Sequence, residues 1–383
     1  MSAIWPFRPL APHLEALEWL TDVQTARSGL ELRSALRTGP RVVLEMEYNL
    51  RAPAERARFE ALSYTSQDQV CGLPWWPGQR DLGPLAAGVS RLDCDTAGAG
   101  FRPGGRALVI RHAESWEEAE IAAVDPDGLT LAAPLAGSYP RAQAAPLLSC
   151  RMDLAFTRRD LPTGRSLGSA VFTALDPEPP DPGRAGTVWE HAELFPQRLW
   201  CDQEGMERRG SRAAEELDNR TGGVRRVVHS ESTASVIPLR LRADTPEQSL
   251  ELRRFLHRLS GRLTAFWLPT GRADLALAAP VAQGATVLTV AAASCVQLLA
   301  SPARRALCLR APDGAVLPRR VSSARALDGG LEELTVTEAL PAIPVSARVS
   351  WLALARLDAD RVELSWERAG CCRVETRARE VWL

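Results

Sequence analysis

The first clear pattern in the chain is an alternation of polar and apolar residues over Arg41–Leu50, which predicts a strand with one buried face. The apolar face consists of Val42, Leu44, Met46 and Tyr48. Pro53 follows, and because the first helical position needs no N–H donor, a helix is expected from there to about Tyr64. Its inward residues are expected to be Phe59 and Leu62.

The second half of the chain has the same order of elements. Val236 to Leu241 predicts a strand, and Thr245 to Gln248 has the composition of a capping box with Pro246 at the first helical position. Apolar residues at helical spacing follow, namely Leu252, Phe255, Leu256 and Leu259. Ser260 and Gly261 are expected to end this helix. A strand followed by a helix is therefore predicted twice.

After each helix the sequence predicts an aromatic strand that enters a proline turn, and then a series of short strands. The aromatic strands are 71–76 and 263–269. Turn residues such as those of 125–128 and 312–314 separate the short strands. Five or six short strands in a row are typical of a small β-barrel or sandwich. The predicted strands are 89–93, 107–111, 120–124, 129–131, 144–148 and 151–157, then 287–290, 306–310, 320–322, 333–336, 348–354 and 361–367.

These parallels predict two tandem copies of one domain, and internal repeats are the first feature to seek in a sequence. Arg106–Arg111 reads Arg-Ala-Leu-Val-Ile-Arg, and residues 305–310 read Arg-Ala-Leu-Cys-Leu-Arg. The separation between matching positions is 196 at Phe59 and Phe255, 199 at this motif, 205 at the Leu-Thr pairs and 210 at the last matched strand. A slow drift in one direction is what loop insertions produce in a duplicated domain.

Length and charge agree with this organisation. The 383 residues accommodate two domains of about 190 residues, each large enough to bury a core. Hydrophobic residues make up 45%, as in ordinary globular proteins. The 46 basic residues, all of them arginines, are balanced by 47 acidic residues, and the net charge is −1. A positively charged surface for binding nucleic acid is therefore not expected. No signal peptide is predicted, and polar residues and Pro280 interrupt the uncharged stretch 275–300, so membrane insertion is not expected either.

No motif predicts enzymatic chemistry, a metal site or a cofactor. The eight cysteines form no Cys-x-x-Cys pair and resemble small buried hydrophobic residues made in a reducing cytoplasm. Ser166 lies in a Gly-x-Ser-x-Gly match, but the preceding residues 161–164 predict a turn and not the strand of a nucleophile elbow, so a hairpin is expected. Asp93, Asp95 and the acidic residues of 114–120 lack the spacing of a calcium loop.

The predicted boundaries follow from the elements. Residues 1–38 form an N-terminal arm, and 39–175 form the first repeat, with a strand–helix module (39–88 and 149–175) and a small barrel (about 89–148). A proline-rich linker, 176–188, separates it from the second repeat, 189–383. That repeat divides into a strand–helix module (189–284 and 358–383) and a small barrel (about 285–357). The fold class is thus mainly β, a β-rich α+β protein.

Several motifs resemble those of tail-tip proteins of long, non-contractile-tailed bacteriophages, the distal tail or baseplate hub proteins. The motifs are Trp5–Pro9, residues 17–23, 31–37 and 217–222, Trp267–Thr270, and Asp274–Leu275. The resemblance covers most of the chain and implies a tail-tube-like module, a β-sandwich with one flanking helix, in a ring below the tail tube. It implies location in the virion at the distal end of the tail.

Two such modules in one chain predict a trimer with pseudo-six-fold symmetry, with a hexamer as the alternative. The expected partners are further copies of the chain, the tail tube protein, the tape measure and other hub or fibre proteins. The alternative function is a carbohydrate- or host-surface-binding tail module, with the aromatic–proline turns as stacking platforms; as structural parts, the same turns would anchor each helix to its barrel. The residues expected to anchor the chain or contact other subunits are Trp5, Phe7, Arg8, Trp19, Trp75, Trp76, Trp189 and Trp267.

Overall fold

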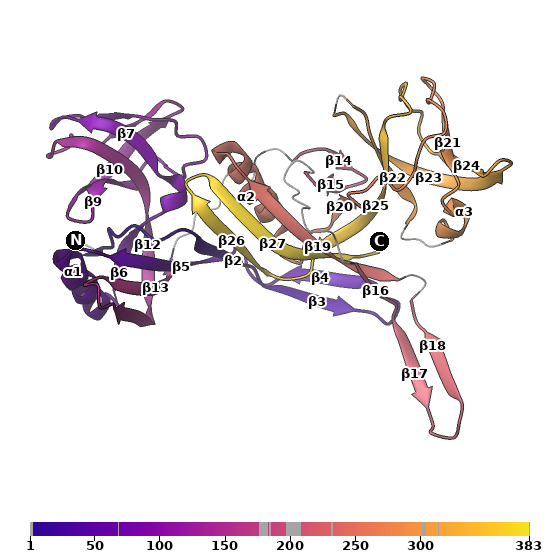
Figure 1. The fold of residues 1–383 in the computed structure, drawn as a ribbon, viewed down its shortest axis with the longest axis horizontal. Helices are drawn as coiled ribbons and strands as arrows, with labels where there is room; N and C mark the ends of the chain where they lie inside the picture. The colour runs from indigo at the N-terminus through magenta and orange to yellow at the C-terminus, as the bar shows by residue number, and fades with distance from the viewer. Residues whose placement is uncertain are drawn as a thin grey trace.

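The computed structural model describes residues 3–67, 69–175, 183, 185–196, 208–230, 233–300, 304–312 and 314–382. Strands account for 53% of the residues and helices for 10%, which confirms a mainly β fold. Figure 1 shows the first half of the chain on the left and the second half on the right, each with a group of short strands above it.

The first half is built around β5 (Arg41–Leu50), whose predicted apolar face is buried. Helix α1 (Pro53–Thr65) begins at the predicted proline and buries Phe59. Strand β13 (Ser166–Ala174) pairs with β5, and the long strand β12 (Tyr139–Asp160) pairs with both β13 and β6 (Val70–Pro74). Near the N-terminus, β1 (Ala3–Ile4) lies parallel to β6.

The second half repeats these pairings in the same chain order. Strand β19 (Ala234–Ala243) pairs with β27 (Cys371–Glu380), and β20 (Phe266–Pro269) pairs with β25 (Arg348–Leu357). Strand β15 (Ala192–Leu194) follows β14 (Val188–Trp189) and lies parallel to β20, as β1 does to β6. Strand β26 (Arg361–Arg368) pairs with β27, in the position that the last third of β12 has beside β13.

Helix α2 (Pro246–Leu259) forms for the reasons that the sequence suggests. The Thr245 side chain accepts a hydrogen bond from the Gln248 backbone, and the four predicted inward residues are buried. Ser260 ends the helix in the left-handed conformation, with φ 51°. Helix α1 has no side-chain cap; instead Glu55 accepts hydrogen bonds from the backbone N–H groups of Arg51 and Ala52.

Two smaller groups of strands have separate apolar cores. The first contains the strands β7 (Arg80–Leu85), β8 (Arg91–Asp93), β9 (Arg106–His112), β10 (Ser115–Asp125), β11 (Gly128–Leu131) and the start of β12. The second contains β21 (Val287–Ala291), α3 (Cys295–Leu298), β22 (Ala306–Arg310), β23 (Val316–Leu327), β24 (Leu331–Val336) and the start of β25. The largest core is shared by the two halves, because one cluster of buried residues runs from β5 and α1 into α2 and β27.

The segment expected to be an N-terminal arm contains regular structure that the sequence did not predict. Strand β2 (His13–Glu18) and the hairpin of β3 (Thr21–Thr25) and β4 (Glu31–Ala35) precede β5. In the second half, β16 (Arg209–Ser211) and the hairpin of β17 (Ala214–Asp218) and β18 (Val224–Val228) precede β19. Most of the predicted linker, 176–182 and 184, lies outside the described residues.

A constant separation of 193 residues relates these two segments. Glu18 pairs with Arg41, and Ser211 pairs with Ala234. Thr21 pairs with Ala35, and Ala214 pairs with Val228. Both helices begin at prolines with the same separation, Pro53 and Pro246. The register of pairing is therefore identical from strand to helix start. Because α1 and α2 also begin 193 residues apart, Phe59 corresponds to Leu252, and the predicted match of Phe59 with Phe255 at a separation of 196 is wrong.

Candidate assembly interface

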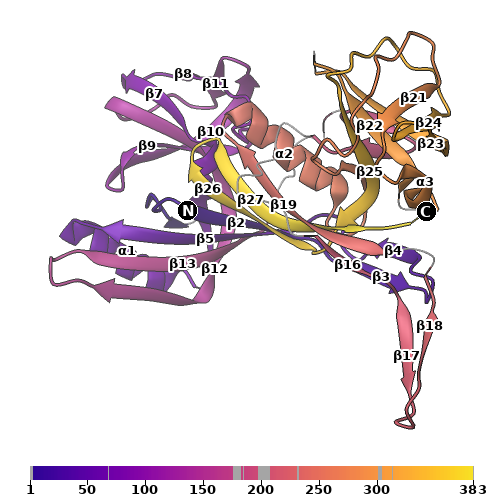
Figure 2. The same ribbon diagram turned by 45° about the vertical axis from the view of Figure 1, so that its right-hand side comes forward.

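The two halves meet along β2, which lies between β5 of the first half and β26 of the second half (Figure 2). Its neighbours on both sides run antiparallel to it, so Leu17 pairs with Val42 on one side and with Val362 on the other. A strand paired on both sides leaves no open edge between the halves. This strand makes the sheet continuous from one half to the other.

A buried carboxylate on β2 joins side chains from both halves. Glu15 is fully buried, and its Oε2 accepts hydrogen bonds from the indole nitrogens of Trp366 (2.9 Å) and Trp75 (3.3 Å). Nη2 of Arg253 on α2 lies 3.0 Å from Glu15 Oε1, and its guanidinium stacks over Trp75 at 4.4 Å from the ring centre. Trp75 belongs to the first half, and Trp366 and Arg253 belong to the second. Glu15 therefore holds the halves together by neutralising a cation that the second half supplies.

A second polar cluster follows at the end of β2. Thr21 donates hydrogen bonds to Asp360 from its backbone nitrogen (2.9 Å) and its hydroxyl (2.8 Å), and Arg262 donates to the same carboxylate from its backbone nitrogen at 2.9 Å. Burial by itself raises the pKa of Asp360, but the hydrogen bonds from Arg262 and Thr21 outweigh it and keep that pKa below its ordinary value. Beside this cluster, Trp19 packs edge-on against His257 of α2 at 5.9 Å.

The β3–β4 hairpin extends this contact across the second half (Figure 1). Arg356 of β25 makes a two-pronged ion pair with Glu31 of β4, with both distances 2.7 Å and both side chains nearly inaccessible to solvent. At the hairpin tip, a Cβ atom on Gly29 would lie 3.5 Å from the Trp382 indole nitrogen. The hairpin of the first half is thus a docking element for the second half.

The corresponding elements at the two outer ends of the molecule lack such partners among the described residues. The β17–β18 hairpin projects away from the body in both views, and its residues are almost all exposed (Figures 1 and 2). At the opposite end, Phe156–Asp160 of β12 pair with β13 alone among the described strands. Two apolar side chains beside that edge, Tyr64 and Leu154, are 70% and 77% exposed.

Six of the eight predicted anchor residues are buried within the chain. Trp5 and Phe7 lie among Tyr48, Phe59 and Phe172, so the first residues of the arm cover α1 and β5. Trp19 and Trp75 lie at the joint between the halves, as described above. Trp76 and Trp267 are also buried. These side chains anchor the chain to itself, and their contact with other subunits stays a prediction.

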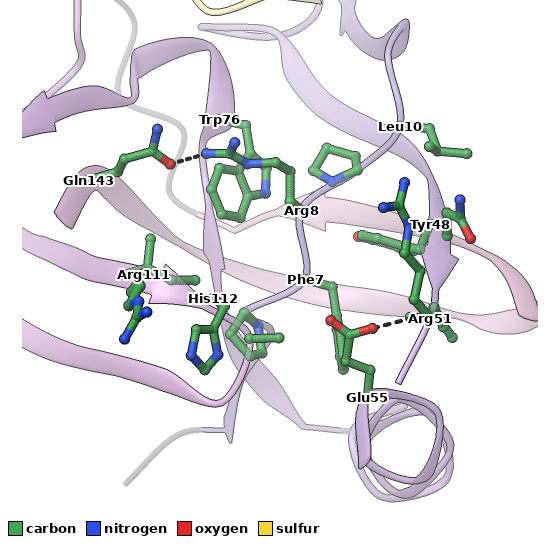
Figure 3. Close-up of a pocket in the computed structure, with 16 residues that line it drawn as sticks. Phe7, Arg8, Leu10, Tyr48, Arg51, Glu55, Trp76, Arg111, His112 and Gln143 are labelled. Carbon is green, nitrogen blue, oxygen red and sulfur yellow. Dashed lines mark hydrogen bonds between the residues drawn. The ribbon is translucent and has the colours of Figure 1, made fainter. Parts of the chain in front are cut away.

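The other two anchor residues lie nearer the surface. Trp189 is half-buried against Trp267, whose indole nitrogen donates to the Trp189 carbonyl at 2.9 Å. Arg8 is exposed and stacks over Trp76 at 5.2 Å, while its guanidinium donates to Gln79 and Gln143. Arg8 is one of the residues that line a pocket of about 340 Å³, and Figure 3 shows it between Trp76 and Gln143. The pocket is lined also by Arg51, Arg111, His112 and Glu55.

Ser166 lies at a hairpin turn. The hydroxyl of Ser166 is buried and donates to Asp160 across the turn that joins β12 to β13, which confirms the predicted hairpin. No group of metal ligands occurs in the part of the chain that the structure describes. Six cysteines are buried, Cys94 is half-exposed, and Cys201 lies outside the described ranges. In those ranges no helix is long and apolar enough to cross a membrane.

Comparison with models of known protein families and with curated proteins finds no match for this sequence. The joint between the halves is therefore interpreted from its geometry. Sequence analysis found Trp19 and Trp75 but missed Glu15, Arg253, Asp360 and the β3–β4 hairpin. The alternation of Leu14, Ala16 and Glu18 with His13, Glu15 and Leu17 was the available signal for β2. The buried face carries a histidine and a glutamate, so the alternation was not apolar and went unnoticed.

Proposed function

We propose that the protein is a structural subunit of a bacteriophage tail tip, a ring that joins the tail tube to the hub or fibres and leaves a lumen for DNA. The chain is on this view a duplicated tail-tube-like module, each copy a β-sandwich with one flanking helix and a small barrel. The single observation that carries the proposal is the repeated strand pairing, with one hairpin docked inside the chain and its counterpart projecting outward.

Two modules joined by a heterologous contact predict further contacts of the same kind. Such contacts close into a ring when the rotation between modules divides a full turn, and otherwise form an open filament. The β3–β4 and β17–β18 hairpins point in different directions in both views, so the relation between the halves includes a rotation (Figures 1 and 2). Three chains with two modules each would supply six positions, and the proposed assembly is this trimer, with a hexamer as the alternative.

The proposed partners are the tail tube protein on one face of the ring, and the tape measure and other hub or fibre proteins. A role in binding rather than catalysis fits the buried Ser166 and the tightly packed tryptophans. The alternative, a module that binds carbohydrate or a host surface, would need exposed aromatic rings. Trp75, Trp76 and Trp267 offer none, because all three rings are buried.

Measurement of the mass of the purified protein in solution, followed by two-dimensional averaging of electron micrographs, tests the proposal. Closed rings of three chains with six similar lobes and a central hole are the expected result. Monomers that bind glycans would contradict the ring and favour the alternative. In a phage particle, labelling of the chain should place it at the distal end of the tail, and its presence in the head or along the whole tail would exclude the proposed position.

A further inference from the structure

The residues on both sides of the joint inside the chain have counterparts elsewhere in the molecule. The residues of β2 and of the β3–β4 hairpin that the first half presents at the joint have counterparts 193 positions later, toward the projecting end of the second half. The second-half residues that contact the first half at the joint also have counterparts in the first half. On the helices that separation is again 193, because α1 and α2 begin at Pro53 and Pro246.

The last strands relate by a slightly larger separation, which the pairing registers define. Tyr48 pairs with Gly168, and its counterpart Leu241 pairs with Val374, so β13 and β27 differ by 206. In turn Gly168 pairs with Arg158, and Val374 pairs with Leu364, so the edge of β12 and β26 also differ by 206 and not by the 210 predicted from the sequence. Residues 155–160 of β12 are therefore the counterpart of the strand that receives β2 inside the chain.

The central charge pair of the joint has a counterpart with its signs reversed. Arg208 is the counterpart of Glu15, and Glu60 is the counterpart of Arg253. Arg208 occupies the Glu15 position within its own half, since it donates to the Thr270 carbonyl at 2.5 Å as Glu15 accepts from Trp75, and both contacted residues follow a Leu-Pro pair. Nε of Arg208 is buried without a hydrogen-bond partner among the described residues.

At the receiving end, Glu60 belongs to an exposed cluster of acidic and basic side chains. Arg158 lies 2.7 Å from Glu60 and 3.0 Å from Asp160, and the charge of Arg56 also acts on Asp160. Asp160 is the counterpart of Trp366, the other second-half partner of Glu15. An arginine of a second copy at this position would place a cation beside Glu60, as Arg253 lies beside Glu15 inside the chain.

Two more pairs of the joint have complementary counterparts. Trp19 packs on His257 inside the chain, and the corresponding residues are Arg212 and Tyr64, a cation and an exposed aromatic ring. Thr21 binds Asp360 inside the chain, and the corresponding residues are Ala214 and Leu154, which are both apolar. Tyr64 and Leu154 are the two most exposed large hydrophobic side chains among the described residues.

We infer that copies of this chain bind head to tail, with β16 and the β17–β18 hairpin of one copy docked on the β12 edge and α1 of the next, and with Arg208 paired to Glu60. The contact continues the sheet from copy to copy, with Ser211 opposite Ala155 as Glu18 is opposite Arg361 inside the chain. This inference rests on the ring proposed above only in part, because it specifies the contact and does not require that the assembly close.

Charge reversal on the full-length chain tests the inference. Arg208→Glu and Glu60→Arg should each weaken self-association by roughly tenfold or more, since each places like charges in a partly buried contact. The double variant should restore association, because it recreates the arrangement of Glu15 and Arg253. Arg141→Glu, an exposed position on the first small barrel with the same change of charge, is the control and should associate as the wild type does. Association of both single variants at wild-type strength would overturn the inference.

Cysteine pairing provides a second measurement that does not depend on how well a charge variant folds. Ser211→Cys with Ala155→Cys should form disulfide-linked oligomers under mild oxidation that reductant reverses. Ser211→Cys with Arg159→Cys should not, because the second position is four residues, or about 13 Å, farther along the same edge. Linked filaments that do not close would support the contact and contradict the ring, rings without the linkage would support the ring and contradict the contact, and unlinked monomers would contradict both.

Discussion

The β3–β4 and β17–β18 hairpins have the same pairing register, but one packs on the body of the molecule and the other is exposed to solvent. The β3–β4 hairpin lies on the second half of its own chain, and Glu31 of this hairpin forms a nearly inaccessible ion pair with Arg356. The β17–β18 hairpin projects from the molecule, and its ion pair, Glu216 with Arg226, is exposed on both sides. The comparison teaches that the backbone pairing alone does not decide what a hairpin does. The partner surface decides it, and the chain supplies that surface to one hairpin only.

The largest expected effect is at the centre of the docked joint. Glu15→Ala would leave the largely buried Arg253 without its counter-charge and two indole nitrogens without an acceptor, so it should lower the free energy of unfolding by about 3–5 kcal/mol. Urea denaturation followed by tryptophan fluorescence measures this change. Glu47→Ala, at an exposed position of β5, should change stability by less than about 0.5 kcal/mol. A similar small effect at Glu15 would show that the joint does not depend on this carboxylate.

The comparison of the hairpins themselves predicts an unequal pair of effects. Glu31→Ala removes the buried partner of Arg356 and should cost about 3 kcal/mol. Glu216→Ala removes an exposed pair, which typically contributes less than about 1 kcal/mol. Equal losses of stability in denaturation experiments on the single chain would mean that the β3–β4 hairpin is not held as described.

Acid should weaken the joint selectively, because two histidines lie within it. Burial lowers the pKa of His13 to about 4, and burial together with the charge of Arg253 lowers the pKa of His257 to about 4. Histidine in the unfolded chain has a pKa of about 6.5, so between about pH 6.5 and 4 the unfolded chain binds protons at these two positions and the folded chain does not. The stability from these groups is therefore complete above about pH 6.5 and is lost as the pH falls toward 4.

The slope of unfolding free energy against pH is proportional to the number of protons taken up on unfolding. Replacing both histidines by glutamine should lower that number by up to about two in this pH window. Denaturation curves at several pH values between these limits measure it. His112→Gln, at an exposed position of β9, is the matched control. An unchanged slope in the double variant would show that protonation of these two side chains does not affect the stability of the joint.

The smallest effects distinguish the two helices. Thr245→Ala removes the side-chain cap of α2 and should cost about 1 kcal/mol. Ala52 occupies the same position before α1, has extended backbone angles and makes no side-chain cap, so Ala52→Thr should stabilise the first half by about 0.5–1 kcal/mol. Thermal unfolding of both variants against the wild type measures the two changes, and a gain from Thr245→Ala would be inconsistent with the capping contact.

Much of the fold could be predicted from local patterns. The bounds of β5 and the starts of both helices followed from alternation and from proline at the first turn, and the structure agrees at each of them. Other strands were wrong in extent. Residues 144–148 and 151–157 were predicted as two strands on either side of a module boundary, but β12 runs unbroken from Tyr139 to Asp160. Nothing local marks continuity, since the long strand changes partners along its length.

The joint could not be predicted in the same way. Glu15 and Arg253 are 238 positions apart, and each by itself has the appearance of a surface charge on a strand or helix. Only the packing of β2 between two halves removes both from water. The shared core has the same origin, because the prediction of separate domains assigned each half its own core, whereas buried residues of both strand–helix modules form one cluster.

The sequence by itself determined the two strand–helix units, their prolines and caps, and the strands that alternate in polarity, since short-range sterics and burial on one face act within a few residues. The tertiary structure alone decided which edge received a strand, which hairpin was covered and which charges became partners. These contacts join surfaces that are hundreds of residues apart in the sequence. Their stability comes from desolvation and from complementary shape and charge, which local sequence patterns do not indicate.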